Sequence, residues 1–115
     1  MHEYAVTQSM IRIAITEAGK ARAKKVTAIN LVIGDLATVV DDSVRLYFSM
    51  IAAGTPAEGA ELNFRRIRAE FFCRHCGKSF VKPAHGFDCP ICGNYGTITD
   101  VGKEFYVESI EVDSA

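Results

Sequence analysis

CRHCGKSFVKPAHGFDCPICG, residues 73–93, contains all four cysteines of the chain in two C-x-x-C pairs. Cys73 and Cys76 form the first pair, and Cys89 and Cys92 form the second. Two such turns facing each other across a short loop bring four thiolates to one point, which suits a tetrahedral metal ion. A glycine follows each pair, and glycine enters the positive-φ region that a sharp turn needs without steric cost. We therefore expect a structural four-thiolate metal site.

Other uses of these cysteines stay open at this point. Two disulfides would need an oxidising compartment, and nothing in the sequence points to one. A rubredoxin-like iron carrier is a second alternative, because CPICG equally suits the metal-binding turn of such a protein. Fe(III) held by four thiolates would be coloured and redox-active, whereas Zn(II) is colourless and redox-inactive. His75 lies inside the first pair and His85 in the loop between the pairs, so both are candidates for an alternate zinc ligand. Four thiolates, however, already fill a tetrahedral site.

The bulk composition is that of an ordinary globular protein. The chain has 115 residues, of which 49% are hydrophobic and 23% charged, and its formal net charge is -1. This length allows one modest core plus a small metal-stapled lobe. The net charge argues against a DNA-coating protein. The opening MHEYAVTQSM resembles no secretory signal, and no apolar run reaches membrane-spanning length, so we expect a cytoplasmic protein.

Residues 4–23 have the periodicity of an amphipathic helix. One face carries Val6, Met10, Ile13, Ala14 and Ala21, and Ile11, Ile15 and Ala18 widen it. So broad an apolar stripe is typical of a helix that packs on a sheet.

Residues 43–53, SVRLYFSMIAA, predict a second helix, and the N-cap candidates are Asp41, Asp42 and Ser43. Its predicted core face consists of Val44, Tyr47, Phe48, Ile51 and Ala52. Leu46 and Met50 fall outside that face. We expect these two side chains to pack against a second neighbour or a partner.

Alternating apolar residues predict strands over residues 26–34, 61–72 and 104–112, with a bulge near Arg65 and Arg66. The cysteines lie between the last two strands. We therefore expect an α+β fold: two helices packed on a three-stranded sheet, with an inserted four-cysteine, zinc-ribbon-like lobe. The expected domains are residues 1–71 with 102–115, and the inserted lobe, residues 72–101.

The first three residues form a second constellation of metal donors. The α-amine of Met1 and the amide and imidazole nitrogens of His2 can chelate one ion, with the amide nitrogen of Glu3 as a fourth donor. Four nitrogens in a plane suit Ni(II) or Cu(II). In an arbitrary protein, a histidine at position two is a chance surface residue. Glu3 has a plainer alternative too, because an acid is favourable at a helix N-terminus.

Four parts of the chain, in order, are the opening MHEYAVTQSM, the VIGDL segment, the two cysteine pairs and the closing EFYVESIEV. Together they resemble the HypA/HybF family of nickel-incorporation proteins for [NiFe]-hydrogenase maturation. The resemblance covers essentially the whole chain. It implies a nickel site that includes His2, and zinc on Cys73, Cys76, Cys89 and Cys92; the chelate described above would add Met1 and Glu3 to the nickel site. It also implies delivery of Ni(II), as transient cargo, to the hydrogenase large subunit, with the nucleotide hydrolase HypB as partner.

The sequence contains no enzyme signature. It lacks the G-x-x-x-x-G-K-[ST] phosphate loop and the G-x-S-x-G nucleophile elbow. We expect a non-enzymatic metallochaperone that binds no nucleic acid and no membrane, and the residues leave open whether it forms a homodimer. The alternative is a zinc-ribbon nucleic-acid-binding module, whose phosphate-facing residues would be Arg65, Arg66, Arg68, Arg74, Lys78 and Lys82.

Overall fold

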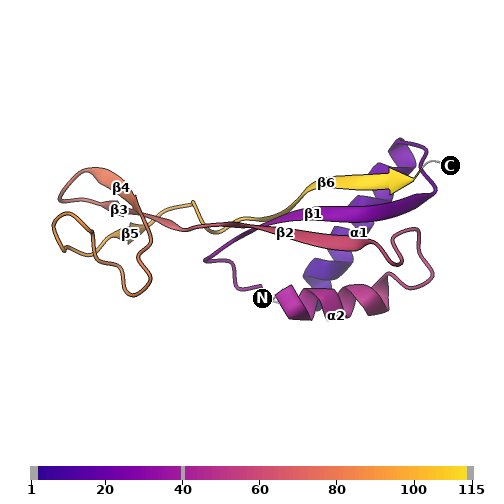
Figure 1. Cartoon of the computed structure of the whole chain (residues 1–115), viewed down its shortest axis with the longest axis horizontal. Helices are drawn as coiled ribbons and strands as arrows, with labels where there is room; N and C mark the ends of the chain where they lie inside the picture. The colour runs from indigo at the N-terminus through magenta and orange to yellow at the C-terminus, as the bar shows by residue number, and fades with distance from the viewer. Residues whose placement is uncertain (1–2, 40, 114–115) are drawn as a thin grey trace. The chain divides into compact units, whose positions relative to one another are not determined.

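The structure is a computed structural model that describes residues 3–39 and 41–113 (Figure 1). The chain divides into two compact units. The first takes in Met1–Val32, Thr38–Arg65 and Tyr106–Ala115, and the second takes in Ile33–Ala37 and Arg66–Phe105. The domain boundaries expected from the sequence, at residues 72 and 101, stay a prediction.

Two helices and three strands make up the larger sheet-and-helix layer. In chain order these are α1 (Glu3–Lys20), β1 (Lys25–Gly34), α2 (Asp41–Ile51), β2 (Glu61–Ile67) and β6 (Phe105–Asp113). The sheet order is β2-β1-β6, so that β1 is the central strand (Figure 1). The cysteines are inserted between β2 and β6. The predicted α+β class, with two helices on a three-stranded sheet, is confirmed.

The buried stripe of α1 differs in part from the predicted one. Its members are Thr7, Met10, Ile11, Ala14 and Ala18, which are spaced as one face of a helix. Ile13 is 49% exposed and Ala21 lies beyond the helix end, so their assignment to the core face is wrong. The stripe is rotated toward Thr7 because that side chain satisfies its own hydroxyl: Thr7 Oγ1 donates to the Glu3 carbonyl at 2.6 Å.

Helix α2 begins at Asp41, so the three N-cap candidates Asp41, Asp42 and Ser43 lie inside the helix rather than before it. Their predicted N-cap role is therefore wrong, although two carboxylates in a first turn still favour the helix dipole. The predicted core face is confirmed at Val44, Phe48 and Ala52, all of which are buried.

The side chains predicted to lie outside the core face of α2 are exposed. Leu46 is 59% exposed and Met50 is 58% exposed. Between these positions, the ring of Tyr47 meets the ring of Tyr4 edge-on, with 5.5 Å between centroids. This contact ties the first turn of α1 to α2.

The predicted strand 61–72 is wrong as one element, because it divides into β2 and β3 (Glu70–Cys73). The break falls at Ala69, which is fully buried. Gly102, at φ +106°, passes so close that a Cβ on it would lie 2.7 Å from Ala69 Cα. The Ala69 carbonyl leaves the strand pattern to accept the Lys82 N–H at 2.8 Å.

The second unit has its own antiparallel sheet, in the order β4-β3-β5, which the sequence pattern did not predict. Strands β4 (Lys78–Val81) and β5 (Thr97–Ile98) flank β3. Phe71 on β3 is fully buried. Its ring stacks on Phe87 at 5.2 Å and meets Phe80 edge-on at 5.9 Å. This aromatic cluster forms a small core beside the cysteines, since β3 ends at Cys73.

Candidate metal centre

The four cysteines converge as their spacing predicts. Their sulfur atoms all lie within 4.8 Å of one another. Cys73 Sγ is 3.5 Å from Cys92 Sγ, and Cys76 Sγ is 3.9 Å from Cys89 Sγ. A disulfide bond is about 2.0 Å long, and all four cysteines are free thiols. The disulfide alternative is therefore not what this arrangement shows.

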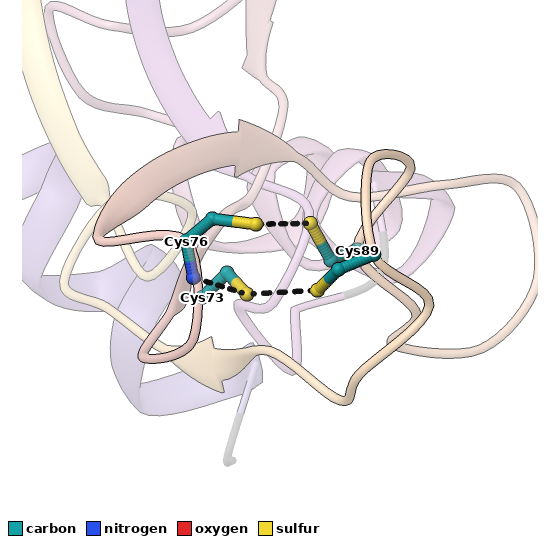
Figure 2. Close-up of side chains that lie close together, drawn as sticks. Cys73, Cys76 and Cys89 are labelled. Atoms are coloured by element: carbon teal, nitrogen blue, oxygen red, sulfur yellow. Dashed lines mark hydrogen bonds between the residues drawn. The ribbon is translucent and has the colours of Figure 1, made fainter.

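The sulfur separations fit a tetrahedral metal ion. Zinc–thiolate bonds of about 2.3 Å in a tetrahedron put neighbouring sulfurs roughly 3.8 Å apart. The Cys73–Cys92 and Cys76–Cys89 sulfur distances, 3.5 and 3.9 Å, lie on either side of that value. Figure 2 shows the side chains of Cys73, Cys76 and Cys89 directed toward a common space. The donor set is therefore suitable for one tetrahedrally coordinated ion.

The first knuckle is a tight turn at the end of β3. The Gly77 N–H donates to the Cys73 carbonyl at 2.7 Å, and Gly77 adopts φ +70°. The Cys76 N–H donates to Cys73 Sγ at 3.4 Å. Gly77 therefore performs the role expected of it, because the turn closes through a residue with positive φ.

The second knuckle is closed by backbone hydrogen bonds on both sides. The Cys89 N–H donates to the Asn94 carbonyl at 2.8 Å, and the Gly93 N–H donates to the Cys89 carbonyl at 2.9 Å. Outside them, Asp88 and Tyr95 form an isolated antiparallel bridge. The knuckle is thus a short hairpin that holds Cys89 and Cys92 on one turn.

The four thiols differ in exposure and in acidity. Cys73 and Cys89 are buried, Cys76 is half-buried and Cys92 is exposed. The Asn94 backbone amide stabilises the Cys92 thiolate and lowers the pKa of Cys92 to about 6. Hydrogen bonding to Cys92 and loss of water raise the pKa of Cys76 to about 12. Without a metal, Cys92 is the natural thiolate of the group and Cys76 keeps its proton.

The histidines near the knuckles do not join this group. Within the described residues, the cluster of metal-ligating side chains consists of the four cysteines. His75 and His85 are both exposed. Of the basic residues considered for nucleic-acid binding, Arg65 is engaged elsewhere: its Nη2 contacts Glu108 Oε2 at 2.5 Å.

Two of the three N-terminal donors, Met1 and His2, lie outside the described residues. Glu3 is the first residue of α1. Its carbonyl is held by the hydroxyl of Thr7, which is fully buried. Its N–H belongs to the first turn of a helix, where backbone donors have no intrahelical partner. No described helix is both long and apolar enough to cross a membrane.

One polar residue at the metal centre was missed by the sequence reasoning. Asn94 Nδ2 donates to Cys92 Sγ at 3.4 Å. Its position two residues after the last cysteine is the available signal, and that position alone does not say where an asparagine side chain turns.

The protein thus has two parts: helices packed with a sheet, and an inserted segment whose two cysteine pairs bring four thiols together. This combination defines a small metal-binding protein. The family model described as "Hydrogenase/urease nickel incorporation, metallochaperone, hypA" matches residues 1–112. The chain belongs to this HypA family, which confirms the resemblance noted from the sequence.

Curated relatives match over nearly the whole chain. A protein of Caldanaerobacter subterraneus subsp. tengcongensis named hydrogenase maturation factor HypA is 46% identical over 114 residues, covering 98% of this chain and 100% of the relative. A protein of the same name from Dehalococcoides mccartyi is 44% identical and covers 98% and 95%.

Solved structures share the fold. The solution structure of the Ni metallochaperone HypA from Helicobacter pylori matches with a TM-score of 0.69 at 24% identity, covering all of both chains. A second solution structure of a HypA protein matches with a TM-score of 0.72, also at 24% identity, over 100% of this chain and 98% of that one.

Proposed function

We propose that this chain binds Ni(II) through its first residues and passes the ion to the large subunit of a [NiFe]-hydrogenase during maturation. Membership of a nickel-incorporation family over residues 1–112 carries the proposal. The chain also begins with Met1-His2-Glu3, whose nitrogen donors suit Ni(II). In this role the protein is a carrier and not an enzyme, and nickel is its transient cargo.

The start of α1 supports Glu3 as a donor. Its amide N–H has no helical hydrogen bond to lose. A deprotonated, metal-bound amide nitrogen is anionic, and the positive end of a helix dipole favours negative charge. Binding through Glu3 would therefore leave the hydrogen bonds of α1 (Glu3–Lys20) intact.

For the four-cysteine centre we propose a structural zinc ion held by Cys73, Cys76, Cys89 and Cys92. Closed four-thiolate sites of this spacing are typical of structural zinc. When bound, zinc would supply rigidity to a unit whose own core is a small cluster around Phe71. The domain division at residues 72–101 follows from the same idea, since the metal closes that segment on itself.

For partners we propose HypB and the hydrogenase large subunit, in the cytoplasm. Leu46 and Met50 are two exposed apolar side chains on α2 that a partner, or a second copy in a homodimer, would cover. The alternative function, nucleic-acid binding by the knuckle lobe, would require a strongly salt-dependent affinity.

Nickel transfer tests the proposal directly. Untagged protein loaded with one equivalent of radioactive nickel is mixed with purified nickel-free large subunit in the presence of a chelator that captures released metal. We expect label in the large subunit with wild type and loss of that transfer with His2→Ala. Equal transfer by both proteins would refute an N-terminal site. Transfer by neither, despite tight nickel binding, would refute the delivery role.

A further inference from the structure

The four metal-ligating cysteines are not held equally. Cys73 and Cys89 are buried, whereas Cys92 is exposed. Cys73 is also fixed at the end of a paired strand, because it lies opposite Lys78 in the β3–β4 register. Cys92 lies on a loop turn between its glycine and Ile91, which is 73% exposed. Of the ligand set, Cys92 therefore has the least protein around it.

Asn94 compensates for that exposure from a fixed position. Its carbonyl accepts the Cys89 N–H at 2.8 Å, which anchors its backbone to the knuckle. From there its Nδ2 reaches Cys92 Sγ at 3.4 Å. The corresponding place in the first knuckle, two residues after Cys76, is Lys78, which carries no amide. A side-chain amide at this position is therefore found in the second knuckle, which holds the exposed ligand Cys92, and is missing from the first knuckle.

We propose that Asn94 is a positioning residue of this metal site: its side-chain amide holds the Cys92 thiolate in the ligand set, and Cys92 is the ligand at which the site opens to solvent. The inference rests on the proposed zinc ion. It identifies Cys92 as the first of the four ligands to leave the ion and Asn94 as the neighbour that controls its departure.

The physical reason is that a metal–thiolate bond and a hydrogen bond to the same sulfur act together. The side-chain amide of Asn94 stabilises negative charge on the Cys92 sulfur and restricts the Cys92 side chain to the orientation that faces the other thiolates. Without the amide, Cys92 can turn toward water with little obstruction. Cys73 and Cys89 have no such route, because both are buried.

Zinc release tests the proposal. The full chain is loaded with zinc, and the metal is withdrawn by an excess of a chromogenic chelator. Asn94→Ala and Asn94→Asp both remove the amide donor while keeping the backbone N–H. We expect zinc release roughly 10-fold faster than in wild type, the lower end of what outer ligand partners contribute to metal affinity. The matched control is Asn63→Ala, which removes an exposed asparagine amide that donates to Asn30; its release rate should equal that of wild type.

A second readout separates positioning from general loosening of the lobe. Zinc-loaded proteins are pulsed with iodoacetamide, and the alkylated cysteine is located by mass spectrometry. We expect Cys92 to react first in wild type and faster still in Asn94→Ala, with Cys73 and Cys89 protected in both. Equal labelling of all four cysteines in Asn94→Ala would overturn the proposal, as would release rates unchanged from wild type.

The zinc content of purified wild type is measured first, and this keeps two failures apart. A protein without zinc would refute the proposed metal. Full zinc content with unchanged release in both Asn94 variants would refute the role of Asn94 alone.

Discussion

Gly34 and Gly102 approach so closely that a Cβ on Gly34 would collide with the Gly102 carbonyl group. The same carbonyl accepts the Leu36 N–H at 2.7 Å. Beside it, the Gly34 N–H donates to the Glu104 carbonyl at 2.8 Å, and Glu104 Oε1 accepts the Gly102 N–H at 2.8 Å. The VIGDL segment thus ends β1 against the backbone that leads into β6, and no side chain fits between them.

Gly34→Ala should destabilise the protein. The added methyl group meets backbone rather than a movable side chain, so we expect a loss of about 2 kcal/mol or more in the free energy of unfolding, in the range of an overpacked core. Urea denaturation followed by circular dichroism measures this. The control is Gly19→Ala in α1, where a Cβ would meet nothing within 4 Å; it should be neutral or stabilise by roughly 0.5–1 kcal/mol. Equal stability of wild type and Gly34→Ala would contradict the close approach.

The protein should purify colourless with about one zinc ion per chain. Cys76→Ala should lose that metal and unfold the segment around Phe71, because so small a core relies on the metal for its stability. The α1, α2 and β2-β1-β6 layer should survive, since it buries its own apolar faces. Elemental analysis and two-dimensional NMR measure both effects. A full complement of iron, or unchanged zinc in Cys76→Ala, would contradict the expectation.

Zinc affinity should fall as the pH is lowered from 7 to 5. In the metal-free protein the pKa of Cys92 is lowered to about 6, so this thiolate is ready at pH 7 and becomes protonated below about 6. The pKa of Cys76 is raised to about 12, so this thiol must lose its proton on binding at every pH in the range. Protons therefore compete with zinc for the thiolates at every pH in this range, and below about pH 6 zinc must also displace a proton from Cys92. Competition titrations against a chelator of known pH dependence measure this affinity. A plot of the logarithm of zinc affinity against pH should become steeper below about pH 6, and a constant slope would argue against a pre-formed thiolate at Cys92.

Nickel binding should need a free N-terminus. A short tag before Met1 converts its amine to an amide and should weaken nickel binding about as much as His2→Ala does, while zinc content and fold stay unchanged. A four-nitrogen planar site gives the absorption of low-spin Ni(II), whereas further ligands give weak octahedral bands. Titration of untagged, tagged and His2→Ala protein, followed by absorption, measures both affinity and geometry. If all three bind nickel equally, the ion sits elsewhere, and His75 and His85 become the next candidates.

The protein should bind HypB without hydrolysing nucleotide itself. The chain lacks a phosphate loop, so nucleotide turnover in a mixture should come from HypB alone. Analytical ultracentrifugation with and without nucleotide and nickel measures the complex. Leu46→Glu with Met50→Glu tests whether the exposed apolar pair on α2 contributes, with Ile13→Glu as an exposed control on α1. The absence of a complex in every nucleotide and metal state would rule the partnership out.

Much of the fold could be predicted from the sequence because its signals are local. The cysteine spacing predicted the cluster, and apolar periodicity predicted the order of helices and strands around it. The division between β2 and β3 could not be predicted, because it depends on contact between Ala69 and the distant Gly102. The rotated stripe of α1 depends on a buried hydroxyl, Thr7, that periodicity counts as polar. Asn94 was missed for a related reason: its significance lies in the direction of one side chain.

The bridge between Asp88 and Tyr95 has a practical consequence. The chain contains no tryptophan and four tyrosines. Of these, Tyr95 alone falls within Arg66–Phe105, at 80% exposure and one residue from Asn94. The other three are the edge-on pair Tyr4 and Tyr47, and Tyr106 on β6. Tyrosine fluorescence therefore has separate sources in the two units. Subtracting the fluorescence of Tyr95→Phe from that of wild type isolates the contribution of Tyr95, next to the second knuckle. Tyr95 thus provides an intrinsic optical signal from the hairpin that holds Cys89 and Cys92, without an added dye.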